Sequence, residues 1–84
     1  GRRAVVGYED TTESDEELFQ RLRALRKEIA DEKGFPPYLI FNDATLREMV
    51  VRRPTNEDEL LDIAGVGPVK LERYGAAFLE ELNS

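Results

Sequence analysis

Residues 62–70 read DIAGVGPVK, and this stretch is more informative than any other in the chain. An apolar helical end runs into Gly65-Val66-Gly67, and a new helix opens at once with Pro68. Glycine adopts backbone angles that other residues resist, and proline suits the first position of a helix because its missing N–H is not needed there. The pattern predicts a helix-hairpin-helix-like turn followed by Lys70. Two interpretations stay open: the bare amides of the hairpin hold a phosphate, or Val66 fills the core beneath a tight turn.

The composition limits both the size of the protein and its chemistry. The 84 residues suffice for one small domain, and 40% of them are apolar, which allows a single thin core. Neither Cys nor His is present, so the commonest nucleophile, general base and metal ligands are missing. We therefore predict no catalytic residue, no metal site and no cofactor. No apolar run approaches the ~20 residues that span a bilayer, and we expect no membrane contact.

The charge of the chain conflicts with a phosphate-binding hairpin. Eighteen acidic and twelve basic side chains give a net charge of −6. A dedicated nucleic-acid binder usually carries the opposite sign, because neutralisation of phosphates dominates its affinity. We therefore expect any intrinsic affinity for nucleic acid to be weak or absent.

Apolar spacing and capping residues predict an all-α fold, a compact bundle of four to five short helices. The predicted helices run from Ser14 or Asp15 to Lys33, from Asn42 or Asp43 to the residue before Pro54, from Asn56 for a short stretch, and from Pro68 towards Leu82. Their predicted inner faces contain Leu18, Leu22, Leu25 and Ile29; Leu46, Met49 and Val50; Leu60, Leu61 and Ile63; and Val69, Leu71, Tyr74, Phe78, Leu79 and Leu82. Gly75 either divides the last helix or allows close packing.

Two segments are predicted to be non-helical. Residues 1–14 lack helical periodicity, and we expect a flexible linker or N-terminal extension there, with the domain itself over residues 15–84. Residues 35–41 contain two adjacent prolines, which exclude a continuing helix. We predict a loop or short turn that crosses the core, with Leu39, Ile40 and Phe41 partly buried.

Five motifs in a fixed order resemble a known family. They are LFxxLRxLR at 18–26, PPY at 36–38, FNDATL at 41–46, LxxIxGVGxxK at 60–70 and YGxxFL at 74–79. Together they resemble the helicase-and-RNase-D C-terminal (HRDC) domain over residues from about 15 to 83, most closely in the form found in bacterial RecQ DNA helicases. The resemblance implies a five-helix bundle that is monomeric, auxiliary and not itself an enzyme. It also implies a parent ATP-dependent 3′–5′ DNA helicase of the bacterial cytoplasm and nucleoid, active in replication, recombination or repair; an RNase D-type exonuclease parent is the alternative.

The resemblance and the charge pattern together indicate a candidate nucleic-acid surface. In nucleic-acid-binding members of the family an exposed aromatic ring lies near the Pro-Pro-Tyr loop, where this chain has Tyr38. The sequence alone favours a ring that seals this loop against the first helix; the alternative is a ring that stacks on an unpaired base. The candidate binding residues are Tyr38, Arg26, Lys27, Gly65, Val66, Gly67, Lys70 and Arg73. The competing interpretation of the basic helix is a solvated surface with pairs such as Lys27–Asp31.

Acidic residues precede the hairpin and suggest a different partner. Glu57, Asp58, Glu59 and Asp62 carry like charges close to the hairpin, and they would repel DNA. We predict that they form a protein-interaction surface, which docks on a basic surface of another domain of the parent or of a partner protein. Two hypotheses therefore compete. In one, the domain binds single-stranded or junction DNA directly; in the other, it tunes the parent through interdomain contacts.

Overall fold

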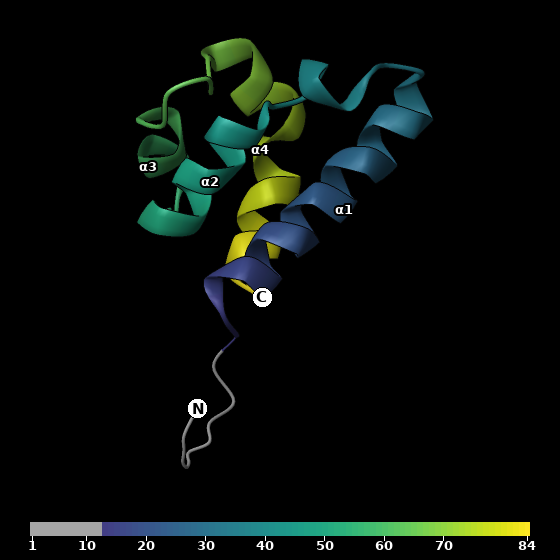
Figure 1. Cartoon of the computed structure of the whole chain (residues 1–84). Helices are drawn as coiled ribbons and strands as arrows, with labels where there is room; N and C mark the ends of the chain where they lie inside the picture. The colour runs from purple at the N-terminus through teal and green to yellow at the C-terminus, as the bar shows by residue number, and fades with distance from the viewer. Residues whose placement is uncertain (1–12) are drawn as a thin grey trace.

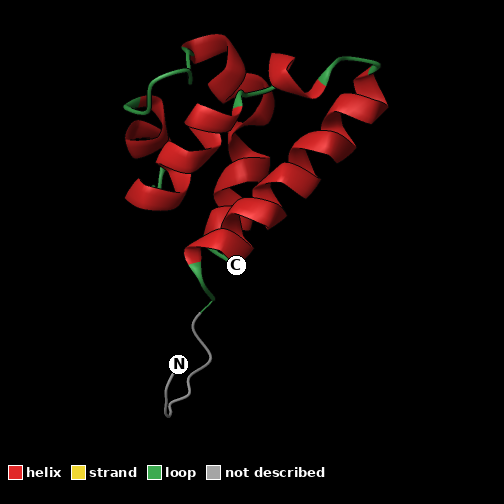
Figure 2. Ribbon diagram, viewed as in Figure 1, coloured by secondary structure: helices red, strands yellow, loops and turns green. Residues whose placement is uncertain are grey.

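A computed structural model of the protein describes residues 13–84. It contains α1 (Asp15–Lys33), the 3-10 turn η1 (Pro37–Leu39), α2 (Asp43–Arg52), α3 (Glu57–Leu61) and α4 (Pro68–Leu82). Helix α1 runs along one side of the molecule and packs on α2 and α4, while α3 packs on α4 (Figure 1). Short loops join the helices, and no strand occurs within the described residues, so the all-α prediction is confirmed (Figure 2). The predicted linker lies outside the described residues except for its last two positions.

Local signals set the ends of α1. The Ser14 hydroxyl accepts a hydrogen bond from the Glu17 amide at 3.1 Å, and the Glu17 carboxylate accepts one from the Ser14 amide at 2.9 Å. This reciprocal capping box satisfies two amides that the first turn leaves free. At the other end Gly34 has a φ of 73°, a left-handed angle that suits glycine. Both predicted boundaries of α1 are confirmed.

Asparagine side chains cap α2 and α3. Asn42 accepts from the Thr45 amide at 2.8 Å, and Asn56 accepts from the Glu59 amide at 2.9 Å. The Glu59 carboxylate then binds the amide and hydroxyl of Thr55, one residue before the cap, at 2.8 and 3.0 Å. Glu59 thereby secures the entry to α3, a helix of five residues.

The core forms around three aromatic rings. The ring of Phe41 meets that of Phe78 edge to face at 5.0 Å and that of Tyr74 at 6.1 Å between centroids. Most of the predicted inner faces are buried, but three residues predicted to be wholly or partly buried are exposed. Leu39 turns outward on η1, Leu61 ends the short α3, and Val69 lies in the first turn of α4; they are 46%, 40% and 59% exposed.

Gly75 lies within α4, where the absence of a Cβ leaves room for the Leu71 side chain of the same helix. Helix α4 is continuous through this position, which excludes the first of the two alternatives given for Gly75, a divided helix. A Cβ at Gly75 would lie 2.9 Å from Leu71 Cδ1 and 3.7 Å from Leu60 Cδ2. Among the described residues, no helix combines the length and apolar character needed to cross a membrane.

Candidate nucleic-acid interface

Tyr38 projects from a corner that is anchored on both sides. The Phe35 amide donates to the Ala30 carbonyl of α1 at 2.9 Å, and the next residues close η1 through a hydrogen bond from the Ile40 amide to the Pro37 carbonyl at 3.0 Å. Ile40 and Phe41 then enter the core. Tyr38 remains 66% exposed between these anchors, so the sealing interpretation is wrong.

A basic groove lies beside this corner, between α1 and η1. It has a volume of about 320 Å³ and is lined by Gln20, Arg23, Ala24, Arg26, Lys27 and Pro37. Three of these residues are cationic and none is acidic. Among the described residues Arg23 has no ion-pair partner, and its guanidinium lies 6.0 Å from the centre of the Phe19 ring. The groove therefore offers positive charge, and Pro37, which precedes the exposed Tyr38 in the chain, lines it.

Arg26 differs from its neighbours because it is buried. Its side chain follows Leu22 by one helical turn, so it points to the core face of α1. One terminal nitrogen, Nη1, lies 3.0 Å from the Phe41 carbonyl oxygen and 2.8 Å from Asp43 Oδ1. Only 7% of the residue is exposed. Arg26 is therefore unsuited to the direct nucleic-acid contact that we predicted for it.

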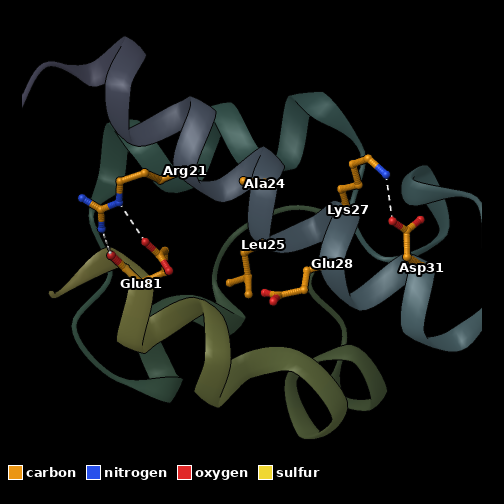
Figure 3. Close-up of a pocket in the computed structure, with 7 residues that line it drawn as sticks. All are labelled: Arg21, Ala24, Leu25, Lys27, Glu28, Asp31 and Glu81. Atoms are coloured by element: carbon orange, nitrogen blue, oxygen red, sulfur yellow. Dashed lines mark hydrogen bonds and ion pairs between the residues drawn. The ribbon is translucent and has the colours of Figure 1, made fainter.

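Lys27 lies at the edge of a second groove, between α1 and α4. This groove has a volume of about 550 Å³, and Leu25 projects into it (Figure 3). Lys27 Nζ lies 2.7 Å from Asp31 Oδ2 at one end, and Arg21 Nε lies 2.8 Å from Glu81 Oε2 at the other. Hydrogen bonds with Glu13, and next with Glu81, raise the pKa of Arg21. Because Glu28, Asp31 and Glu81 also line this groove, its lining carries no excess of positive charge, and we do not assign it to an anion.

The glycine hairpin is built largely for packing. Gly65 has a φ of 95°, and the Val66 amide donates to the Ile63 carbonyl at 3.0 Å. Val66 is only 4% exposed, so its side chain fills the core. This agrees with the interpretation of residues 65–67 as a tight turn above a buried Val66. Gly67 is the N-cap residue of α4, and it has no side chain that could accept hydrogen bonds from the first-turn amides. These amides are therefore open to an anion.

The two cations after the hairpin lie in different surroundings. Lys70 is half-buried, and its Nζ lies 5.8 Å from the centre of the Phe41 ring. Arg73 is exposed, and it has no ion pair within the described part of the chain. The predicted site residues thus fall into two groups, one at the α1–η1 corner and one at the start of α4.

Comparison with known proteins assigns this architecture. The family model described as the HRDC domain matches residues 15–82. This chain belongs to the HRDC family. It is 55% identical over 87% of its length to the ATP-dependent DNA helicase RecQ of Bacillus subtilis, and 57% identical over 93% to that of Haemophilus influenzae. It spans 12% of the length of each of these relatives.

A solved structure supports the same assignment. The HRDC domain 3 of D. radiodurans RecQ superposes with a TM-score of 0.81 and 32% sequence identity. The match covers 84% of this chain and 93% of that domain. The five-helix bundle implied by the resemblance is present here as four α-helices and η1.

Four acidic residues of this HRDC domain lie in α3 or directly after it. Glu57, Asp58 and Glu59 occupy its first turn, where the helix dipole favours carboxylates, and Asp62 follows its last residue. All four are exposed. Hydrogen bonds from the amide of Thr55, and next from its hydroxyl, lower the pKa of Glu59. Within residues 13–84 no group of three or more carboxylates is arranged to hold a metal ion.

Sequence reasoning did not select Arg23 and Gln20 as site residues of this HRDC domain. Helical spacing places Arg23 and Lys27 on one side of α1, and this was visible in the sequence. The fold of η1 over that side, which makes Pro37 a wall of the groove, is a tertiary feature with no local signal.

Proposed function

We propose that this HRDC domain is an auxiliary module of a RecQ-type ATP-dependent DNA helicase and tunes which DNA structures its parent binds. The named relatives are helicases, and this favours a helicase parent over an RNase D-type exonuclease. The 84 residues contain no Gly-x-x-x-x-Gly-Lys-Ser/Thr loop, so ATP hydrolysis would belong to other parts of the parent. We expect a monomeric domain in a helicase that works on the chromosome in the bacterial cytoplasm.

The exposed ring of Tyr38, one residue after the Pro37 that lines an acid-free basic groove, carries this proposal. A base of single-stranded DNA would stack on Tyr38, while Arg23 would neutralise an adjacent phosphate. Lys27 would neutralise another, since its pair with Asp31 is solvent-exposed and therefore weak. Stacking is worth about 1–3 kcal/mol per base. The ring thus selects unpaired over paired DNA, because bases inside a duplex have no free face.

The affinity should be low, and it should depend only modestly on salt. Two phosphate contacts give a slope of log K against log salt of about −1.4 for a single strand. The net charge of −6 further opposes association. A weak site of this kind would contribute mainly when other domains already hold the DNA, because linkage raises its effective concentration.

Binding of a labelled oligothymidine, followed by fluorescence anisotropy at two salt concentrations, tests the proposal. Tyr38→Ala should weaken binding about tenfold, whereas Tyr38→Phe, which keeps the ring, should leave it nearly unchanged. Lys70→Ala, at the start of α4, should have a smaller effect than Arg23→Ala. Equal affinity of the wild type and Tyr38→Ala would contradict the proposed site.

The exposed carboxylates of α3 favour a second function, docking on a basic surface. Glu57 and Asp58 carry no ion pair within the described residues, so they are available to a cationic partner in the same helicase or in another protein. Such a contact would compete with DNA for a basic surface and would make the domain selective or autoinhibitory. Glu57→Lys and Asp58→Lys in the parent helicase should then change its preference among DNA structures. An unchanged preference would exclude this docking surface.

A further inference from the structure

Arg26 is a buried cation that the packing of the core does not explain. Its Nη1 contacts the Phe41 carbonyl oxygen at 3.0 Å and Asp43 Oδ1 at 2.8 Å, while its Nε is buried without a hydrogen-bond partner. Burial of an incompletely satisfied guanidinium costs stability, and an apolar residue of similar size is often at least as stabilising. The position therefore calls for a role other than filling space.

The contacts of Arg26 place it at one of two anchors of the Tyr38 corner. The Phe35 amide binds Ala30 of α1 where the corner begins, and the Phe41 carbonyl binds Arg26 where it ends. Ala30 and Arg26 are one helical turn apart on α1. The short η1 segment between these anchors carries Tyr38, which is exposed.

We infer that Arg26 is a positioning residue for single-strand binding. It holds the end of the corner against α1, so that Tyr38 is presented beside Arg23 and Lys27, and it does not touch the nucleic acid itself. A fixed aromatic platform loses less conformational entropy on binding than a mobile one. This inference rests on the proposed function of Tyr38, but the anchoring itself is measurable without DNA.

Amide hydrogen exchange tests the anchoring in the free domain. The Leu39 and Ile40 amides close η1 by donating to the Pro36 and Pro37 carbonyls, both at 3.0 Å. In Arg26→Met these two amides should exchange about tenfold faster than in the wild type, because one charge-assisted hydrogen bond is lost. Arg26→Lys should restore part of the protection.

Arg21→Met is the matched control, since it removes another arginine of α1. Arg21 pairs with Glu81 on the side that faces α4, so its loss should leave the two η1 amides unchanged. Helical core amides should be compared in every variant. If Arg26→Met does not fold, Asp43→Ala removes the exposed partner of Arg26 instead, with an expected increase of about threefold. Unchanged exchange in η1 would overturn the inference.

A double-mutant cycle with oligothymidine tests the link to binding. Arg26→Met should weaken binding about as much as Tyr38→Ala, and the double variant should be no weaker than either single variant, because both remove the same platform. Additive losses would overturn the positioning role and show that Arg26 acts independently of Tyr38. If the wild type does not bind, the proposed function fails, and the exchange result alone decides whether Arg26 holds the corner.

Discussion

Phe41 connects the Tyr38 corner to the core of the domain. Its ring packs against Phe78 and Tyr74, while its carbonyl oxygen accepts the hydrogen bond from Arg26. The side chain is fully buried. One residue therefore stabilises the fold through its ring and orients the neighbouring corner through its backbone.

Replacement of Phe41 by a smaller apolar residue should destabilise the whole domain. Phe41→Leu loses both edge-to-face contacts and leaves a partly filled cavity, at an expected cost of about 1–3 kcal/mol. Urea denaturation measures this loss. Val51→Ala, at a side chain that is 75% exposed, should stay within about 0.5 kcal/mol of the wild type. Similar midpoints for the two variants would show that the ring cluster is not the centre of the core.

Alanine substitutions at Gly34 and Gly65, which both have a positive φ, distinguish the cost of backbone strain from the cost of a steric clash. A Cβ at Gly65 would lie 2.2 Å from Thr45 Oγ1, whereas one at Gly34 would meet nothing within 4 Å. Gly34→Ala should therefore cost about 1 kcal/mol for its left-handed angle alone, and Gly65→Ala should cost clearly more, about 2–4 kcal/mol. Thermal denaturation of the two variants gives the comparison. Equal losses would mean that the hairpin is not packed against Thr45.

At the scale of the elements, helix ends were predictable and the orientation of single side chains was not. The caps of α1, α2 and α3 involve residues within four positions of each other, so their signals are present in the sequence. The burial of Arg26 and the exposure of Tyr38 depend on how η1 folds over α1, which is a tertiary contact. This is why the sequence assigned a surface role to Arg26 and left open whether the Tyr38 ring seals its loop or stacks on a base.

The contribution of Glu59 to the stability of the domain should decrease at acidic pH. Bonds from Thr55 hold the pKa of Glu59 below its ordinary value, so the charged form is favoured in the folded state. Such a carboxylate stabilises the fold above its ordinary pKa of about 4.3, and this contribution is lost as the pH falls through the lower folded value. The wild type should therefore lose stability relative to Glu59→Gln between about pH 5 and pH 3.

Denaturation of both proteins across this range measures the difference. Thr55→Ala, which removes only the hydroxyl donor, should raise the pKa of Glu59 part of the way back towards its ordinary value, as followed by NMR titration. Parallel stability profiles for the wild type and Glu59→Gln would exclude this contribution.

At the scale of the whole molecule, an acidic protein presents a basic groove on one corner. The cations of the α1–α4 side are paired, and exposed carboxylates surround α3. The net charge of −6 is therefore distributed unevenly, and the sequence alone could not show that an acid-free groove remains. If the groove binds DNA as proposed, long-range repulsion by α3 should reduce its affinity.

Neutralisation of two distant carboxylates should strengthen DNA binding. Glu57→Gln with Asp58→Asn changes the net charge from −6 to −4, and we expect about twofold to threefold tighter binding of oligothymidine at low salt. The gain should shrink near physiological salt, where screening acts within about 8 Å. The swap of Glu57→Asp with Asp58→Glu keeps the charge and serves as the control. Equal gains in both double variants would rule out the electrostatic explanation.

An NMR titration of the isotope-labelled domain with oligothymidine is the most direct test of single-strand binding at the α1–η1 corner. If single strands bind at the α1–η1 corner, the resonances of Tyr38, Arg23 and Lys27 should shift in a saturable way, while those of the hairpin residues 65–67 should shift less. Shifts confined to the hairpin and Lys70, or no shifts at low salt, would contradict a single-strand site at the α1–η1 corner.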